Sequence, residues 1–177
     1  MLPSPGAVAL KAALRAEENI GVREVGHNGG VFVDTYLASI GLPGSGEPWC
    51  MAFVYYRLWD AAGRPADFSL PMGFPRTGST AVAARWAKRN GLWIPVTSAE
   101  GAGERVQRGD LCFFWFPELR RIAHVGIVTG SFDGGVDTVE GNTSPGADVQ
   151  REGDGVYRRR RMWRALGCRG GFARIPF

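Results

Sequence analysis

Four residues in three separate segments could together perform nucleophilic catalysis: Cys50, His124, Glu140 and Asn142. Cys50 follows Pro48-Trp49 and precedes a helical pattern, so we expect its thiol in the first turn of a helix. A helix N-terminus favours negative charge, and a thiol must become a thiolate before it attacks a carbonyl carbon. The alternative for Cys50 is a small, buried core residue on the inner stripe of that helix.

His124 lies in a segment with strand character, residues 122–129. There Ile122, His124, Gly126 and Val128 are expected to share one face of the strand. A single histidine beside apolar residues is more often structural than catalytic. A catalytic role therefore requires partners that are distant in sequence and adjacent in space.

Glu140 and Asn142 could supply the acceptor that a catalytic histidine needs on its second ring nitrogen. At a spacing of two they point the same way in a strand, together with Thr138. A hairpin between 122–129 and 136–139 would bring His124 beside Glu140. The alternative is a polar strand end that leads into a turn over 142–146.

The elements that must position these groups change from helical to extended along the chain. Helical patterns cover 7–20, 33–40, a segment from Trp49 to about Gly63, and a segment capped by Ser79 and ended by Asn90-Gly91. Strand patterns cover 92–96, 111–116, 122–129, 136–139, 156–166 and 172–175, with turns at Gly130, Gly134-Gly135, Gly141 and Pro145-Gly146. Helices followed by strands predict an α+β fold with a segregated antiparallel sheet, and no linker divides residues 1–177.

The chain resembles the cysteine, histidine-dependent amidohydrolase/peptidase family, the CHAP domain. The matching stretches are Pro48–Val54, Gly109–Phe114, His124–Val128, Val139–Asn142 and Gly171–Arg174, which together span about residues 25–175. The resemblance implies a papain-like fold, with N-terminal helices packed on a C-terminal antiparallel sheet or partial barrel. It also implies a single hydrolase domain over 1–177.

By this resemblance Cys50 is the nucleophile and His124 its base and later its acid. Glu140 orients His124, and Asn142 is a further polar member of the site. The backbone N–H of Cys50 would give one oxyanion donor. The second donor is not identified, because the carboxylate of Glu47 would repel a developing oxyanion.

The resemblance further implies a peptidoglycan hydrolase, either an N-acetylmuramoyl-L-alanine amidase or an endopeptidase. Its partner would be peptidoglycan or its peptide stems, and an immunity protein is a further candidate partner. Two other classes stay open: a catalytically inactive cell-wall-binding module on the same fold, and a nucleic-acid-binding protein.

Composition limits where such a protein acts. No apolar run is long enough to cross a bilayer and no secretory signal opens the chain, so we expect no membrane insertion. We expect synthesis in the cytoplasm and action at the bacterial cell wall after lysis or non-Sec export, as an endolysin, a particle-borne hydrolase or an antibacterial toxin. No spacing of histidines and cysteines fits a metal site, and no cofactor fingerprint occurs, so neither is expected.

The positive charge is concentrated near the C-terminus. The net charge of the chain is +4, whereas residues 151–177 hold eight arginines against Glu152 and Asp154. The run Arg158-Arg159-Arg160-Arg161 would divide between two faces of a strand, and no nucleic-acid-binding module accompanies it. We expect a solvated or cell-wall-facing surface there, and no nucleic-acid partner.

Other residues allow two interpretations. His27 and Glu24 could line the substrate groove, but a surface turn is favoured for His27-Asn28-Gly29-Gly30. Cys112 is expected to be buried and inert, and a disulfide between Cys112 and Cys168 is left open. The aromatic rings of Trp49, Trp86, Trp93 and Trp115 could stack on sugars, although large aromatic residues are usually core.

Overall fold

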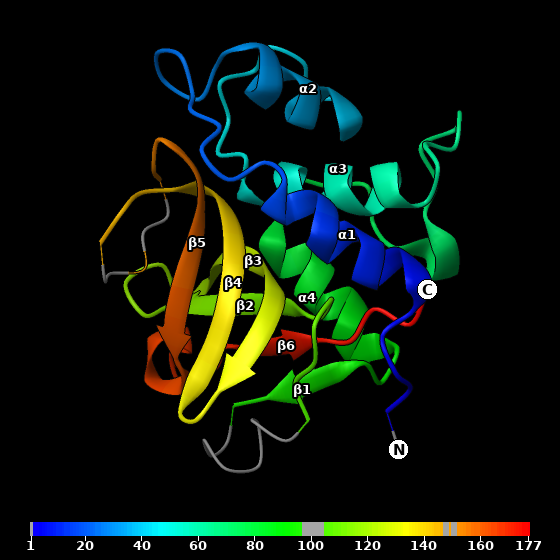
Figure 1. The fold of residues 1–177 in the computed structure, drawn as a ribbon, viewed down its shortest axis with the longest axis vertical. Coiled ribbons are helices and arrows are strands. Elements are labelled where there is room, and N and C mark those ends of the chain that lie inside the picture. Colours follow the sequence, from blue (N-terminus) through cyan, green and yellow to red (C-terminus); the bar gives the residue numbers. More distant parts are fainter. Residues whose placement is uncertain (1, 97–104, 147–148, 150–151) are drawn as a thin grey trace.

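The fold, given by a computed structural model, combines helices from the first half of the chain with a sheet from the second (Figure 1). The structure describes residues 2–96, 105–146, 149 and 152–177. The elements are α1 (Ala7–Glu17), α2 (Val31–Ser39), α3 (Cys50–Ala61), η1 (Pro71–Gly73), α4 (Thr80–Arg89), β1 (Trp93–Pro95), β2 (Leu111–Phe116), β3 (Arg121–Phe132), β4 (Gly135–Thr143), β5 (Gly155–Met162), η2 (Trp163–Leu166) and β6 (Gly171–Ala173). Within these residues no helix is both long and apolar enough to cross a membrane.

All strand pairs are antiparallel, and the sheet has the order β1-β6-β2-β3-β4-β5. The sheet is strongly twisted and does not close on itself, with the helices gathered beside it (Figure 1). This confirms the predicted α+β class and is consistent with a papain-like fold.

Two apolar cores lie on the two faces of the sheet. Val125 and Ile127 of β3 pack with the helices, whereas Val128 packs in a second cluster with Trp163 and Leu166. Because side chains alternate along a strand, this division separates the helix-facing side of β3 from the side that carries His124.

The first helix packs through its small residues. Ala9, Ala12, Ala13 and Ala16 are buried, whereas Leu10 and Leu14 are 42% and 55% exposed. Small side chains allow the backbone of α1 to approach α3 closely. Contact with α1 in turn contributes to fixing the helix that begins at Cys50.

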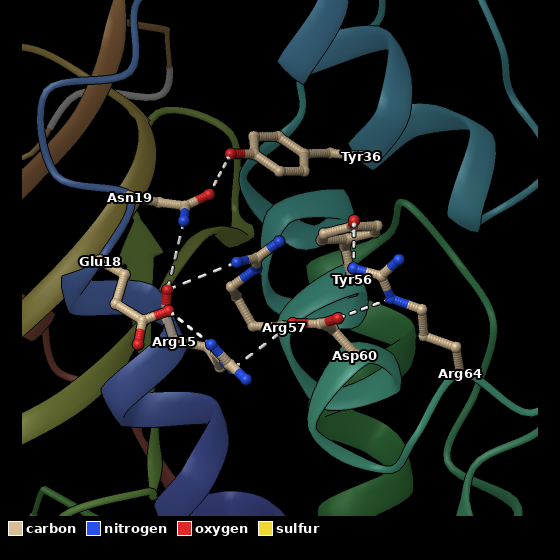
Figure 2. A network of polar contacts seen from close by, with 8 residues as sticks. All are labelled: Arg15, Glu18, Asn19, Tyr36, Tyr56, Arg57, Asp60 and Arg64. Atoms are coloured by element: carbon tan, nitrogen blue, oxygen red, sulfur yellow. Dashed lines mark hydrogen bonds and ion pairs between the residues drawn. The ribbon is translucent and has the colours of Figure 1, made fainter.

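A polar network joins α1, α2 and α3 (Figure 2). The hydroxyl of Tyr36 donates to Asn19 Oδ1 at 2.6 Å, and Arg57 Nη1 donates to the Arg15 carbonyl at 3.4 Å. The guanidinium carbon of Arg57 also lies 5.6 Å from the ring centroid of Tyr36 on α2. These contacts tie α3 to both neighbouring helices.

The fourth helix begins as the sequence predicts. Ser79 Oγ accepts a hydrogen bond from the backbone N–H of Val82 at 3.4 Å, and the helix ends at Asn90-Gly91, where Gly91 has a φ of +68°. Thr80 Oγ1 donates to the Ile122 carbonyl at 2.8 Å, so the start of α4 is held against β3 close to His124.

One strand prediction and two turn predictions are wrong in detail. The segment 156–166 is not one strand, because β5 ends at Met162 and a 3₁₀ turn, η2, follows. Gly130 and Gly141 lie inside β3 and β4 and are not turns. At Gly141 a β-carbon would lie 2.7 Å from the Trp49 ring and 2.8 Å from Phe53, so glycine serves the close approach of β4 to α3.

Candidate active site

Cys50 is the first residue of α3, where the sequence predicts it. Its side chain is only 4% exposed, yet it lines a cavity of about 360 Å³ together with Glu47, Pro48, Ser79 and Arg121. The thiol is therefore held at a helix N-terminus and is also adjacent to a space that a substrate could enter.

The residue before the nucleophile is anchored from the N-terminal segment. Trp49 is fully buried, and its Nε1–H donates to Glu24 Oε2 at 3.2 Å. Asn28 Nδ2 donates to the Gly46 carbonyl at 3.0 Å, whereas His27 itself is exposed. Glu24 and Asn28 thus brace the loop that leads into α3.

His124 lies on β3 opposite Phe114 of β2 and is completely buried. The register shifts between Phe114 and Trp115, and this bulge places Ile122 in the helix-facing core. The prediction that Ile122 shares the face of His124 is therefore wrong, because the extra residue Ala123 reverses the alternation.

Glu140 meets His124 as predicted. The Nε2–H of His124 donates to Glu140 Oε2 at 2.9 Å, and both side chains are fully buried. Thr138 Oγ1 donates to Glu140 Oε1 at 2.7 Å, which confirms that Thr138 and Glu140 share a face of β4. A carboxylate in this position fixes the direction of the imidazole ring.

The other ring nitrogen of His124, Nδ1, is the one left for Cys50. Among the described residues it makes no hydrogen bond of regular geometry, but Cys50 interacts with the ring closely enough to affect its proton affinity. Catalytic contacts of this kind often tighten only when substrate is bound. The arrangement therefore leaves Nδ1 available to exchange a proton with the thiol.

Opposing effects set the proton affinity of His124. Burial lowers its pKa, but interaction with Cys50 and with Glu140 outweighs burial and raises the pKa to about 9 from an ordinary 6.5. The imidazole of His124 is therefore mostly protonated at neutral pH.

Arg161 is a member of this cluster that sequence reasoning missed. Its Nε–H donates to Glu140 Oε1 at 2.8 Å and its Nη2–H to Oε2 at 2.7 Å. Burial favours the neutral carboxyl, yet Arg161 and His124 hold the pKa of Glu140 well below its usual range. Arg161 and Arg159 are both buried, so the prediction that the arginine run is solvated or wall-facing is wrong for these two.

The separation of the arginine run between two faces was predicted correctly. Arg158 and Arg160 are exposed, whereas Arg159 and Arg161 point inward from β5. The alternation itself could be read from sequence. The buried face could not be identified, because four arginines give no hydrophobic signal for the inward direction.

Gly126 makes room for the carboxylate. A β-carbon at this position would lie 2.5 Å from Cγ of Glu140 and 3.3 Å from the Val139 carbonyl oxygen. Because Gly126 lies two residues after His124 on β3, its missing side chain leaves the space that Glu140 fills.

Asn142 is buried near these groups but differs in conformation from a regular strand residue. Its φ is +55°, and the β4–β5 register shifts between Glu140 and Thr143. Its Oδ1 accepts from the Gly153 N–H at 3.3 Å. The spacing rule that would align Asn142 with Glu140 therefore breaks down here, and the observed hydrogen bond supports the turn that leads towards β5.

Other candidate residues do not contact Cys50 or His124 by any hydrogen bond among the described residues, although Cys112 lies close enough to Glu140 and Arg161 for their charges to act on its thiol. Cys112 is buried and Cys168 is exposed, and both are free, so they do not form the disulfide left open by sequence. Trp49 and Trp86 are core residues, whereas Trp93 and Trp115 are partly exposed and lie under Lys88 and Arg169.

The two weakest segments of the sequence resemblance meet in a buried ion pair. Arg174 Nε donates to Asp110 Oδ1 at 2.6 Å, and both side chains are almost completely buried. Asp110 precedes β2 and Arg174 follows β6, so this pair joins neighbouring strands away from His124.

A family model agrees with this geometry. The model of the CHAP domain matches residues 42–142, more than half of the chain and a range that contains Cys50, His124 and Glu140. The chain belongs to the CHAP domain family, whose members are generally cysteine- and histidine-dependent amidohydrolases. No curated protein and no solved structure gives a significant match.

Proposed function

We propose that this protein is a peptidoglycan hydrolase that cleaves an amide or peptide bond through an acyl-enzyme on Cys50. The observation that carries the proposal is the buried His124–Glu140 hydrogen bond at 2.9 Å, beside a cysteine at a helix N-terminus. These are the parts that thiol-dependent acyl transfer requires. Membership of the CHAP domain family supports a cell-wall substrate.

The reaction begins with attack of the Cys50 thiolate on the carbonyl carbon of the scissile bond. The imidazolium of His124 then donates its Nδ1 proton to the leaving amine as the carbon–nitrogen bond breaks. The amine departs, and the acyl group stays on sulfur as a thioester. His124 is now neutral and can act as a base.

Hydrolysis of the thioester returns the enzyme to its starting state. His124 Nδ1 takes a proton from water while the water oxygen attacks the thioester carbonyl. The carbon–sulfur bond breaks, the carboxylic acid product leaves, and Cys50 is again a thiolate beside an imidazolium. Glu140 holds the ring in one orientation through both half-reactions.

The backbone N–H of Cys50 is the proposed oxyanion donor. It lies at the N-terminus of α3, where backbone N–H groups lack partners within the helix. An oxyanion that forms on the attacked carbonyl would be stabilised by this donor and by the helix dipole. Asn142 is proposed to support the site indirectly, because its side chain accepts a hydrogen bond within the β4–β5 connection that follows Glu140.

The finer assignments are also proposals. Residues 1–177 would form one hydrolase domain that acts on the bacterial cell wall, as an N-acetylmuramoyl-L-alanine amidase or an endopeptidase. A phage lysin or an exported antibacterial toxin that is paired with an immunity protein would be the biological setting.

Digestion of purified muropeptides tests the proposal. Wild type, Cys50→Ala and Cys168→Ala would be compared by mass spectrometry, with Cys168→Ala as a control for loss of an exposed free thiol. We expect new free amino groups with wild type and the control, and none with Cys50→Ala. Identical spectra for all three would reject hydrolysis, and wall binding without turnover would identify an inactive binding module.

A further inference from the structure

Three neighbouring strands carry one continuous row of charged groups. His124 lies on β3, Glu140 on β4 and Arg161 on β5, and these strands are side by side in the sheet (Figure 1). The side chains of all three are fully buried. Glu140 lies between the other two, and both His124 and Arg161 donate hydrogen bonds to its carboxylate.

The carboxylate of Glu140 is held by four donors. Oε2 accepts from His124 at 2.9 Å and from Arg161 at 2.7 Å, and Oε1 accepts from Arg161 at 2.8 Å and from Thr138 at 2.7 Å. The fork of the guanidinium engages both oxygens at once. The carboxylate therefore has one orientation in which all four contacts persist, and that orientation directs Oε2 at the imidazole.

An ion pair of this kind adds little to stability. Removing two charges from water costs about as much as their attraction returns, so a buried pair is weak support for a purely structural role. The Arg161–Glu140 pair also differs from the buried Arg174–Asp110 pair, because its carboxylate is shared with an imidazole. The arrangement thus places a cation where it can act on the Cys50–His124 couple through Glu140.

We propose that Arg161 is a positioning residue of the hydrolytic site, which keeps Glu140 ionised and aligned so that Glu140 orients His124 towards Cys50. The inference rests on the proposed function and extends it by one residue beyond the groups that touch substrate. Phe114 completes the support, since its ring centroid lies 5.5 Å from that of His124 and 5.4 Å from the guanidinium carbon of Arg161.

Two substitutions separate the charge of Arg161 from its geometry. Arg161→Met removes the cation while keeping an unbranched apolar side chain. Arg161→Lys keeps a positive charge but offers a single point instead of a planar fork. If the charge acts on the couple, removing it makes every nearby acidic group harder to ionise, so Cys50 should become reactive only at higher pH.

The test is the pH dependence of Cys50 alkylation by iodoacetamide, followed by mass spectrometry of the Cys50 peptide. All proteins would carry Cys168→Ser, because Cys168 is an exposed thiol that would also react. Arg174→Met is the matched control, since it breaks a buried arginine–carboxylate pair away from the couple. The folding of each variant would be checked by thermal denaturation.

The acid limb of alkylation is the pH range in which the rate at Cys50 falls as the pH is lowered. For Arg161→Met we expect this limb to move up by about one pH unit, because a neighbouring charge acts on this scale. In Arg161→Lys the limb should stay near that of wild type while kcat on muropeptides falls about tenfold, since orientation and not ground-state binding is lost. KM should change less than about twofold in both variants. Arg174→Met should leave the limb unchanged.

An acid limb that is the same in Arg161→Met and Arg174→Met would overturn the inference. If Arg161→Met does not fold, Arg161→Lys takes its place, and wild-type kcat in that variant would reject the positioning role. Alkylation needs no wall substrate, so it separates the two proposals. A shifted limb in a protein that never cleaves muropeptides would reject the hydrolase function and keep the link between Arg161 and Cys50.

Discussion

The side chain of Glu140 fills the space next to Gly126 that a larger residue there would need. A β-carbon on Gly126 would lie only 2.5 Å from Cγ of Glu140. Glu140 bonds to His124, which precedes Gly126 by two residues on β3. The absence of a side chain at one position therefore permits the hydrogen bond at another.

We expect Gly126→Ala to displace Glu140 and to lower kcat about 100-fold, because small misplacements of catalytic groups have effects of this size. Muropeptide kinetics would measure the loss. Gly130→Ala on the same strand is the control, since its nearest contact, Asp137 Oδ2, would lie 3.7 Å from the new β-carbon. Equal kinetics in both variants would contradict the importance of this space.

The raised pKa of His124, about 9, predicts the basic limb of activity. We expect kcat/KM to fall above about pH 9 as the imidazolium that protonates the leaving amine is lost. A plateau that continues to pH 10.5 would contradict a protonated His124.

The stability of the fold should follow the same groups. The contribution of His124 is fully present below its ordinary pKa of 6.5 and is lost as pH rises through about 9. The contribution of Glu140 is present above its ordinary 4.5 and is lost at acid pH, below that value. Urea denaturation of the protein should thus give maximal stability between these limits, with a flatter acid side in Glu140→Gln.

Glu140→Gln should lower the free energy of unfolding while keeping the overall fold. The reason is that Arg161 then becomes a buried cation that faces a neutral amide. Loss of one partner of a buried pair costs about 3–5 kcal/mol. We expect the double variant Glu140→Gln/Arg161→Met to be more stable than Glu140→Gln alone, measured by urea denaturation. Additive losses would show that the two side chains do not interact.

Arg121 is expected to contribute to substrate affinity. It lines the cavity beside Cys50 and also a neighbouring cavity of about 220 Å³ with Arg85, Lys88 and Arg120. Arg121→Ala should raise KM for stem peptides with free carboxylates several-fold and leave kcat within about twofold. Cys50 alkylation is the control. A change in the alkylation rate of Cys50 with no change in KM would instead show that Arg121 acts on the reactivity of the Cys50–His124 pair.

The sequence predicts much of this site because its signals are local. A proline and a turn before an apolar stripe place Cys50 at a helix start, and alternation places Thr138 and Glu140 on one face. Arg161 could not be found in this way, because its role depends on which face of β5 is buried. Asn142 and Ile122 were misplaced because bulges in β3 and β4 interrupt the alternation.

Gly141 shows a second limit of the sequence. In a polar segment a glycine is typical of a turn, and here it lies within β4 because Trp49 and Phe53 leave no room for a side chain. Only the packing of α3 against β4 distinguishes the two cases, and that packing joins residues about 90 positions apart.

Trp49 is hydrogen-bonded to Glu24, and Glu140 is hydrogen-bonded to Arg161. Both Glu24 and Arg161 lie outside the region 42–142 that the family model covers. A fragment limited to that region would keep Cys50, His124 and Glu140. It would lose the Glu24 carboxylate and the Arg161 guanidinium, whose hydrogen bonds hold the neighbouring Trp49 and Glu140 in place. Domain boundaries chosen for expression should therefore extend from before Glu24 to beyond β5.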